Sequence, residues 1–172
     1  MKKQAVAIVV AHKKRAPLGK VLGVSRRDNH SAFGFPGGKV DEGETPEDAA
    51  YRELKEETGI VSIKLEPLHT GFDNDGYEVT TFVMIDADSD EAFEKFKDVD
   101  DKEGLVDWVD WEALTDKSNQ WWEYNRAVMN AWVKRFIEED PFNKIAIDGI
   151  KTLQHAMDIM KKLDKLDEKK SS

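Results

Sequence analysis

Residues 38–60 read GKVDEGETPEDAAYRELKEETGI, and this stretch predicts a glycine-containing loop followed by a short helix. Thr45 is a residue type that caps helix N-termini. Pro46 suits the first helical position, because the N–H that it lacks would have no partner there. Gly59 can end the helix in the left-handed conformation that other residues adopt only with strain. A helix over 46–58 is therefore expected, and its side chains carry the functional signal.

The predicted helix has three glutamates on one face of its last two turns. Glu53, Glu56 and Glu57 are three and four residues apart, and like charges at this spacing repel by roughly 0.2–0.5 kcal/mol per pair. They also lie at the negative end of the helix dipole, where cations are normally favoured. Ala50 and Leu54 form an apolar stripe that can hold the helix on a core. The cluster is either a solvated acidic face or a site for a hard divalent cation with oxygen ligands.

The residues before the helix favour the metal site. Gly37 and Gly38 leave room for a metal or a phosphate to approach the backbone. Glu44 adds a fourth carboxylate at the junction of loop and helix, and Lys39 adds a cation for a phosphate oxygen. A conflict between side-chain charge and helix dipole, set beside glycines, is expected at functional sites.

Taken together, these positions resemble the Nudix box, and every defining position of that motif is filled. The pattern is Gly38, five residues, Glu44, seven residues, Arg52-Glu53-Leu54, one residue, Glu56-Glu57, one residue, Gly59-Ile60. A weaker resemblance in strand order and loop placement extends over roughly residues 4–135. The resemblance implies an α/β (α+β) protein with the Nudix fold, a mixed β-sheet between helices, here with extra C-terminal helices. It also implies hydrolysis of a nucleoside diphosphate linked to a further moiety, with Mg²⁺ or Mn²⁺ as cofactor.

The resemblance also assigns roles within the motif. It places metal ligands at a backbone carbonyl and four glutamates, of which the carbonyl and Glu44 complete or buttress the site: Gly38, Glu44, Glu53, Glu56 and Glu57. Arg52 would orient a catalytic glutamate through an ion pair. The general base would be one of these glutamates or Glu103, whose other interpretation is a surface residue. Metals would neutralise phosphate charge and supply hydroxide near neutral pH, so positioning matters more than a protein nucleophile.

Residues 33–39, FGFPGGK, resemble the MutT-like branch of the family, whose members attack (deoxy)nucleoside triphosphates. By this resemblance Phe35 would help form the base pocket, Arg26 would contact phosphate, and Asn119 would read the base with its amide. Lys39 is the fourth candidate for substrate binding. The first three each have a structural interpretation as well: core packing for the phenylalanine, a solvated strand end for the arginine, and a helix N-cap for the asparagine.

These assignments favour an enzyme that cleaves a nucleoside triphosphate to a nucleoside monophosphate and pyrophosphate. The alternative within the family is a hydrolase of ADP-ribose, a dinucleoside polyphosphate or another nucleoside diphosphate derivative. The alternative from another class is a nucleotide-sensing Nudix module without catalysis. The intact set of four glutamates and Arg52 argues against such a module, which has no need of them.

The composition limits the partners and the environment of the chain. Its 172 residues include 26 Lys and Arg against 35 Asp and Glu, which gives a net charge of −9. This balance argues against binding to duplex nucleic acid or to an anionic membrane, since both need a basic surface. The sequence has no cysteine, which excludes disulfides and thiolate zinc sites. We therefore expect a cytoplasmic enzyme with a small nucleotide substrate.

Hydrophobic patterning predicts a Nudix hydrolase domain over 1–140 and a helical extension over 141–172. Besides the helix over 46–58, the domain should contain a structured loop over 31–43, five strands and a short helix: strands 5–11, 21–25, 60–65, 78–86 and 104–109, and helix 89–97. Two amphipathic helices are expected over 120–137 and 145–166. The apolar stripe of the last helix needs a cover, either from a second subunit in a homodimer or from the preceding helix in a hairpin.

Overall fold

The computed structural model describes residues 2–11, 19–97, 99–100 and 104–138, and beyond them residues 157, 158, 160–162 and 165. The chain falls into two compact units, Met1–Val128 and Met129–Ser172, and each unit is described by itself. Among the described residues, no helix combines the length and the apolar character that crossing a bilayer requires.

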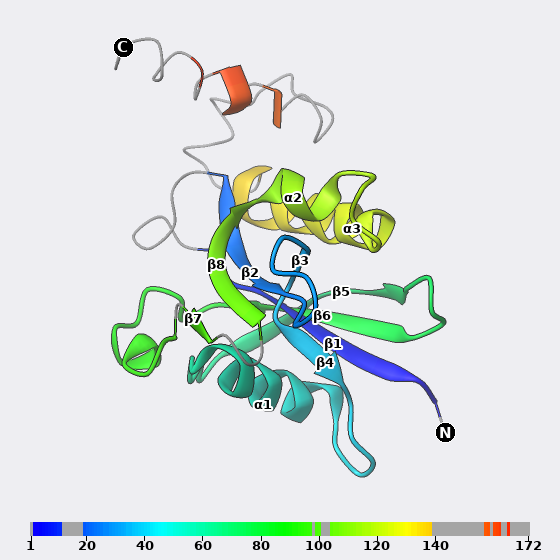
Figure 1. Ribbon diagram of the computed structural model, residues 1–172. Helices are drawn as coiled ribbons and strands as arrows, with labels where there is room; N and C mark the ends of the chain where they lie inside the picture. Colours follow the sequence, from blue (N-terminus) through cyan, green and yellow to red (C-terminus); the bar gives the residue numbers. More distant parts are fainter. Residues whose placement is uncertain are drawn as a thin grey trace. The chain divides into compact units, whose positions relative to one another are not determined.

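The first unit contains a four-stranded mixed sheet in the order β4-β1-β6-β5 (Figure 1). β1 (Gln4–Val9) is an inner strand, parallel to β6 (Glu78–Met84) and antiparallel to β4 (Gly37–Lys39). β5 (Leu65–Phe72) completes the sheet and is antiparallel to β6. The glycine loop predicted from the sequence therefore joins the sheet directly, through β4.

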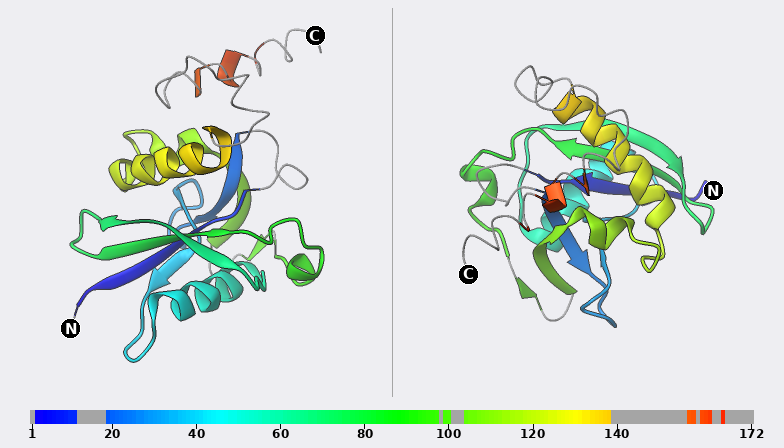
Figure 2. Two further views of the ribbon diagram at one scale, coloured as in Figure 1. Left: turned by 180° about the vertical axis from the view of Figure 1, so that it is seen from behind. Right: turned by 90° about the horizontal axis from the view of Figure 1, so that it is seen from above.

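A second four-stranded sheet has the order β3-β2-β8-β7, and all of its neighbouring strands are antiparallel. Its strands are β3 (Phe33–Gly34), β2 (Lys20–Ser25), β8 (Gly104–Asp110) and β7 (Val99–Asp100). Strands of both sheets lie between helices in the first unit (Figure 2). The α/β (α+β) class predicted from the sequence is confirmed.

The helix α1 (Pro46–Thr58) begins and ends where the sequence predicts. The Thr45 hydroxyl accepts a hydrogen bond from the Asp48 N–H at 3.1 Å, which satisfies one of the free donors of the first turn. Gly59 has a φ of 74°, and its N–H donates to the Lys55 carbonyl. Both ends are thus fixed by local chemistry.

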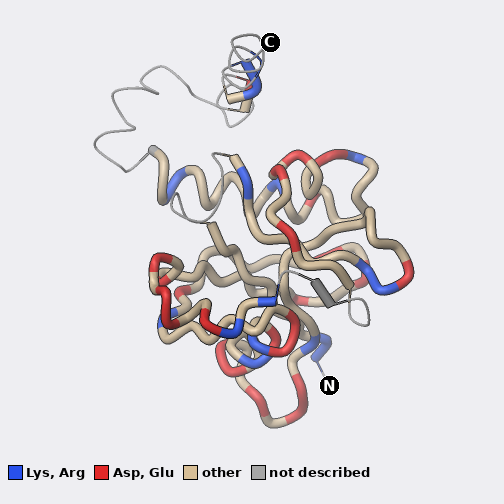
Figure 3. The backbone as a smooth tube through the Cα atoms, turned by 60° about the vertical axis from the view of Figure 1, so that its left-hand side comes forward, with Lys and Arg blue, Asp and Glu red and all other residues tan. Residues whose placement is uncertain are grey.

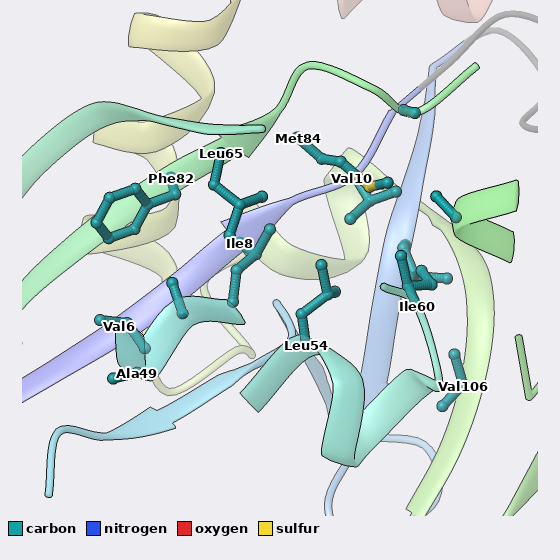
Figure 4. Packing of buried hydrophobic residues seen from close by; sticks show 14 residues of the cluster. Val6, Ile8, Val10, Ala49, Leu54, Ile60, Leu65, Phe82, Met84 and Val106 are labelled. Atoms are coloured by element: carbon teal, nitrogen blue, oxygen red, sulfur yellow. The ribbon is translucent and has the colours of Figure 1, made fainter. Parts of the chain in front are cut away.

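α1 packs its apolar stripe on one face of the first sheet (Figures 2 and 4). The buried cluster between them combines side chains of α1, both sheets and the segment after α1: Val6, Ile8, Val10, Leu22, Ala49, Ala50, Leu54, Ile60, Leu65, Phe82, Met84 and Val106 among others. Leu54 and Ile8 are fully buried there. Burial of one such aliphatic side chain stabilises the fold by about 1.5–3 kcal/mol, so the core holds α1 firmly while its acidic face stays outside.

Four further helical segments are described. They are a 3₁₀ turn, η1 (Glu91–Phe93), the helix α2 (Trp111–Thr115), the helix α3 (Trp122–Val133), and a π-helical turn, η2 (Lys134–Glu138). The Tyr124 hydroxyl at the start of α3 donates to the Val79 carbonyl of β6 at 3.0 Å. The start of α3 therefore lies on the face of the first sheet opposite α1.

The strand predicted over 60–65 is wrong. Residues 60–64 do not form a strand. Ile60 is buried in the core, whereas Ile63 is 83% exposed. The polar groups of this segment make individual hydrogen bonds to other segments in place of a strand ladder. The Ser62 hydroxyl donates to Asp86 at 2.5 Å, and the Val61 N–H donates to the Ala92 carbonyl. The strand instead begins at Leu65 and continues to the end of β5.

Other boundaries also differ from the expectation. The structured loop over 31–43 contains β3 and β4, and the helix expected over 89–97 is only the turn η1. The helix α2 was not predicted, and the helix expected over 120–137 continues as the π turn η2. Most of the helix predicted over 145–166 lies outside the described residues, although those described between 157 and 165 are helical. The domain boundary at residue 140 also lies outside them and stays a prediction.

Candidate active site

The acidic face of α1 meets the glycines of β4. A Cβ atom built on Gly38 would lie 2.5 Å from the Glu53 Oε1, so only glycine leaves room for this carboxylate. The Glu53 side chain is 15% exposed. The Gly37 N–H donates to the Glu57 Oε2 at 3.1 Å. Two of the four glutamates predicted as metal ligands thus lie against the Gly37-Gly38 backbone.

Arg52 joins the carboxylates into a network. Its Nε and Nη2 each donate to one oxygen of Glu44 at 2.8 Å, which is the paired geometry that suits guanidinium and carboxylate. Its Nη1 donates to Glu53 at 2.9 Å and to Glu56 at 3.2 Å. Its Nη2 also donates to the Lys39 carbonyl at 3.1 Å. One guanidinium therefore connects the loop, β4 and α1.

The pKa values of two carboxylates in the network are shifted in opposite directions. Hydrogen bonds from Arg52 and from the Asp41 N–H lower the pKa of Glu44 to about 2. Burial raises the pKa of Glu53, and the hydrogen bond and charge of Arg52 offset this only in part. The hydrogen bond to Glu44 raises the pKa of Arg52. Glu44 is therefore a permanent anion that holds Arg52, while Glu53 is a carboxylate partly withdrawn from water.

The predicted ligands do not form a closed metal cage. Among the described residues, no three acidic or histidine side chains are grouped closely enough to hold an ion. Glu56 has a 57% exposed side chain and contacts Arg52. Glu44 accepts a hydrogen bond from Arg52 at each of its two oxygens. Acidic and basic residues are interspersed over the backbone in the view of Figure 3.

A cavity of about 560 Å³ lies between the loop after β2, β3 and the segment between α2 and α3. It combines aromatic and polar side chains: Arg26, Asp28, Asn29, Ser31, Ala32, Phe33, Ala113, Ser118, Asn119, Gln120 and Trp121. Two predicted substrate residues, Arg26 and Asn119, are in its lining, whereas Phe35 and Lys39 are not. The structure therefore places two of the four predicted substrate residues in the cavity lining and two outside it.

The two cavity residues predicted from the sequence are both engaged by the protein. Arg26 donates to both oxygens of Asp28 at 3.0 and 3.2 Å, and its Nη1 donates to the Gln120 Oε1 at 3.1 Å. The Asn119 Nδ2 donates to the carbonyls of Phe33 and Ala113 at 2.8 and 3.1 Å. Its Oδ1 accepts from the Trp121 N–H at 3.0 Å, within the turn that precedes α3.

The other predicted residues have separate surroundings. Phe35 is half-buried and packs edge-on against the buried ring of Trp111, with ring centroids 5.6 Å apart. The Lys39 Nζ lies 5.7 Å from the centre of the Tyr77 ring. Glu103 lies outside the described residues.

The cavity and the carboxylates are neighbours along the chain. A Cβ built on Gly34 in β3 would lie 3.3 Å from the Trp121 ring that lines the cavity. Gly38, four residues later, lies against Glu53. Because a chain extends by at most about 3.6 Å per residue, the Cα atoms of Gly34 and Gly38 are at most about 14 Å apart. Sequence reasoning missed Phe33, Gln120 and Trp121 as cavity residues, since the aromatic residues read as core.

Comparison with known proteins identifies the family. A sequence model of the NUDIX domain matches residues 1–132. The chain is 43% identical over 60 residues to an RNA pyrophosphohydrolase of Sulfurovum sp. (strain NBC37-1), which covers 35% of this chain and 38% of that protein. It is 58% identical over 40 residues to an 8-oxo-dGTP diphosphatase of Haemophilus influenzae, covering 23% and 29% of the two chains. The chain thus matches well under half the length of these curated relatives.

Solved structures show the same fold. A MutT structure, from work on MutT of Aliivibrio salmonicida and Vibrio cholerae, matches with a TM-score of 0.57 and 23% identity, covering 79% of this chain and all of that one. A Nudix hydrolase family member from Chromobacterium violaceum matches with a TM-score of 0.56 and 18% identity, over 98% of this chain and 97% of that one. At these identities the likeness concerns the fold alone.

Proposed function

The chain belongs to the Nudix family, and from this premise we propose that it is a metal-dependent pyrophosphohydrolase of nucleoside triphosphates. The products would be a nucleoside monophosphate and pyrophosphate. The observation that carries the proposal is the network in which Arg52 holds Glu44 and Glu53 while Glu53 lies against Gly38. A protein that only bound nucleotides would have no use for this partly buried carboxylate.

The donor set at α1 suits a hard divalent cation. Glu53, Glu56 and Glu57 offer only carboxylate oxygens, which Mg²⁺ and Mn²⁺ prefer, and the sequence has no cysteine that could offer a thiolate. The space at Gly38 that a side chain would fill is a second fitting feature. We propose these three glutamates as ligands, together with the Gly38 carbonyl. When bound, Mg²⁺ or Mn²⁺ would neutralise phosphate charge and make hydroxide available near neutral pH.

The protein residues position the reacting groups. Glu44 fixes the guanidinium of Arg52, and the guanidinium fixes the Glu53 carboxylate at 2.9 Å. The Gly37 N–H donates a hydrogen bond to Glu57 at 3.1 Å. Such preorganisation matters because phosphoryl transfer depends on positioning and electrostatic stabilisation more than on a protein nucleophile. Lys39, next to Gly38, supplies a cation for a phosphate oxygen.

The neighbouring cavity supports a nucleotide as the substrate. Its volume of about 560 Å³ lies within the usual range of small-molecule sites, and it combines the aromatic rings of Phe33 and Trp121 with polar groups. The Cα atoms of Gly34, beside the cavity, and of Gly38, beside Glu53, are at most about 14 Å apart, which allows one elongated ligand to reach both places. We place the nucleoside in this cavity and the phosphates at α1.

A substrate panel with resolved products tests the proposal. The protein is incubated with nucleoside triphosphates, ADP-ribose, a dinucleoside polyphosphate and a 5′-triphosphorylated RNA oligonucleotide, each with Mg²⁺ or Mn²⁺, and the products are separated by chromatography. We expect nucleoside monophosphate and pyrophosphate from at least one free triphosphate. Release of nucleoside diphosphate and phosphate, or hydrolysis only of the RNA or of ADP-ribose, overturns the substrate assignment. Binding without turnover of any compound overturns the enzymatic proposal.

A further inference from the structure

We propose that Lys3 is a second phosphate-binding residue, which the ring of Tyr77 holds beside Lys39, and that these two lysines bind the terminal phosphate of a nucleoside triphosphate. The inference rests on the proposed function, because it assumes that the phosphates of the ligand lie at α1. It deepens that function by naming residues that select a ligand by its number of phosphates. Lys3 and Lys39 together are called the lysine pair.

The Tyr77 ring brings the two lysines together. The Nζ atoms of Lys3 and Lys39 lie 5.5 and 5.7 Å from the centre of this ring, and a cation within about 6 Å of a ring centre is attracted to the ring. The register of the sheet has the same effect, since Lys39 of β4 is opposite Ala5 of β1, two residues after Lys3. Side chains two residues apart along an extended segment share a face. The lysine pair therefore lies on one face of the first sheet, although its members are far apart in the sequence.

The turn that carries Tyr77 is held by hydrogen bonds at two points. The Tyr77 N–H donates to the Asp73 Oδ1 at 2.8 Å, and the Tyr77 carbonyl accepts from the Asp73 N–H at 2.9 Å. The side chain of Asn74, in the same turn, donates at 3.1 Å to the main-chain carbonyl of Gln120, a residue of the cavity lining. The turn that positions the lysine pair is thus connected to the cavity.

The lysine pair lacks carboxylate partners. Among the residues that the structure describes, neither ammonium group forms an ion pair, whereas Arg52 binds Glu44 and Glu53. Strand alternation explains the difference, because Glu53 lies against Gly38 and the Lys39 side chain points to the opposite face of β4. Two neighbouring cations repel each other, so the pair gains from a bound anion.

The functional side of α1 lies along β4, which is an edge strand of the first sheet. The Gly37 N–H donates to Glu57, and the Lys39 carbonyl accepts from Arg52. Both contacts join main-chain groups of β4 to side chains of α1. A ligand that passes this edge of the sheet can therefore meet the glutamates of α1 and the lysine pair at the same time, although they lie on different faces.

The cavity, the glutamates and the lysine pair follow one another along residues 34–39. Gly34 lies beside Trp121 of the cavity. Gly37 donates to Glu57, and Lys39 follows two residues later. Because an extended chain spans at most about 3.6 Å per residue, the path from Gly34 to Lys39 is at most about 18 Å long. A nucleotide with its base in the cavity and its inner phosphates at the glutamates therefore has its terminal phosphate nearest to the lysine pair, which should favour triphosphates over diphosphates.

A binding experiment tests the inference without turnover. The affinity of the full chain for inorganic pyrophosphate is measured by calorimetry in the presence of Mg²⁺. Lys3→Gln should weaken this binding about tenfold, the usual effect of losing one hydrogen bond to a charged group. Lys2→Gln is the matched control, since Lys2 is the neighbouring exposed lysine and has no aromatic partner within the described part of the chain. It changes the net charge equally and should leave the affinity within about twofold, because exposed charges at a distance are screened.

Two substitutions of Tyr77 test the role of the ring. Tyr77→Phe keeps a ring and should leave the pyrophosphate affinity within about twofold, whereas Tyr77→Leu should weaken it about threefold, the effect of a lost cation–π contact at an exposed site. The melting temperatures of both variants are compared with that of the wild type. If Y77L does not fold, the comparison of K3Q with K2Q decides the question, because both of these variants change exposed side chains.

Kinetics separate failure of the inference from failure of the proposed function. K3Q should lower the ratio of kcat/KM for a triphosphate to that for the diphosphate of the same nucleoside about tenfold, and K2Q should not. Wild-type pyrophosphate affinity in K3Q, or an equal loss in K2Q, overturns the inference even if triphosphates are hydrolysed. Absence of pyrophosphate binding by the wild type overturns it as well. If K3Q weakens binding as expected while no nucleotide is hydrolysed, the phosphate site stands and the enzymatic proposal fails.

Discussion

The close contact between Gly38 and Glu53 allows a substitution to be designed that moves one carboxylate and little else. In Gly38→Ala the new methyl would lie 2.5 Å from the Glu53 Oε1 and 2.8 Å from its Oε2. Ordinary carbon–oxygen contacts are about 3.3–3.6 Å, so the carboxylate must move by about 1 Å. A misplacement of this size in a catalytic site can lower activity about 100-fold, or about 2.7 kcal/mol in the barrier.

The same substitution should cost little stability. Gly38 does not have a positive φ, so alanine fits its backbone. Replacing glycine by alanine at such a position stabilises a protein by about 0.4–1 kcal/mol, because the unfolded chain has less conformational entropy to lose. The atoms that clash are the end of a flexible side chain. We therefore expect the free energy of unfolding to change by less than about 1 kcal/mol.

Gly71→Ala is the matched control. Gly71 also lies in a strand without a positive φ, and its new methyl would approach the His69 Nε2 at 3.2 Å, away from the carboxylates. The assay compares kcat/KM for the best substrate and the melting temperature of both variants and the wild type. Wild-type activity in G38A within about threefold, or an equal loss in G71A, would refute the reasoning.

Four further predictions concern the metal, the arginine network and the extension. Glu57→Gln should remove most activity and leave the melting temperature nearly unchanged; near-wild-type turnover at saturating Mg²⁺ would contradict its assignment as a ligand. Exchanging EDTA for millimolar Mg²⁺ or Mn²⁺ should raise the melting temperature, because ligand binding stabilises the native state by RT ln(1 + [L]/Kd); an unchanged value would count against the site. The pKa of Glu44 is lowered from 4.5 to about 2, so its contribution to stability is present above about pH 4.5 and is lost as the pH falls toward 2. The Glu44→Gln variant should accordingly have a lower melting temperature than the wild type at neutral pH, and this difference should become smaller near about pH 3. A difference in melting temperature that does not change with pH would disprove the link between Glu44 ionisation and stability. We also propose a homodimer formed through the C-terminal extension: truncation after residue 140 should convert a dimer to a monomer in light scattering, and a monomeric full-length chain at micromolar concentration would leave the hairpin as the arrangement.

The parts that could be predicted from the sequence are those with local signals. Both ends of α1 could be predicted to the residue, because Thr45, Pro46 and Gly59 determine the helix ends through contacts with residues close to them in sequence. The acidic face could be recognised because three- and four-residue spacings place side chains together on a helix. The family resemblance then supplied the roles of these residues.

The parts that could not be predicted depend on distant contacts. β5 contains Pro67 and Gly71, which weaken a strand signal, and a register shift between Pro67 and His69 accommodates the proline. The segment from Ile60 was mistaken for a strand because it is apolar, although Ile63 points to solvent. Asn119 has an amide whose two carbonyl partners lie in other segments of the chain, so its sequence neighbours could not reveal that its donors are used.

The parallel pairing of β1 with β6 has a consequence for synthesis of the chain on the ribosome. Residues 4–9 pair with residues 78–83, so β1 waits for about 70 residues to be added before its second neighbour exists. At about 5–20 residues per second this interval lasts roughly 3–14 seconds. β4 can pair earlier, but the other edge of the apolar strand AVAIV stays open meanwhile, as a template for wrong pairing. A nascent chain that stops before residue 78 should therefore need a chaperone to stay soluble, whereas one that extends past residue 84 should not.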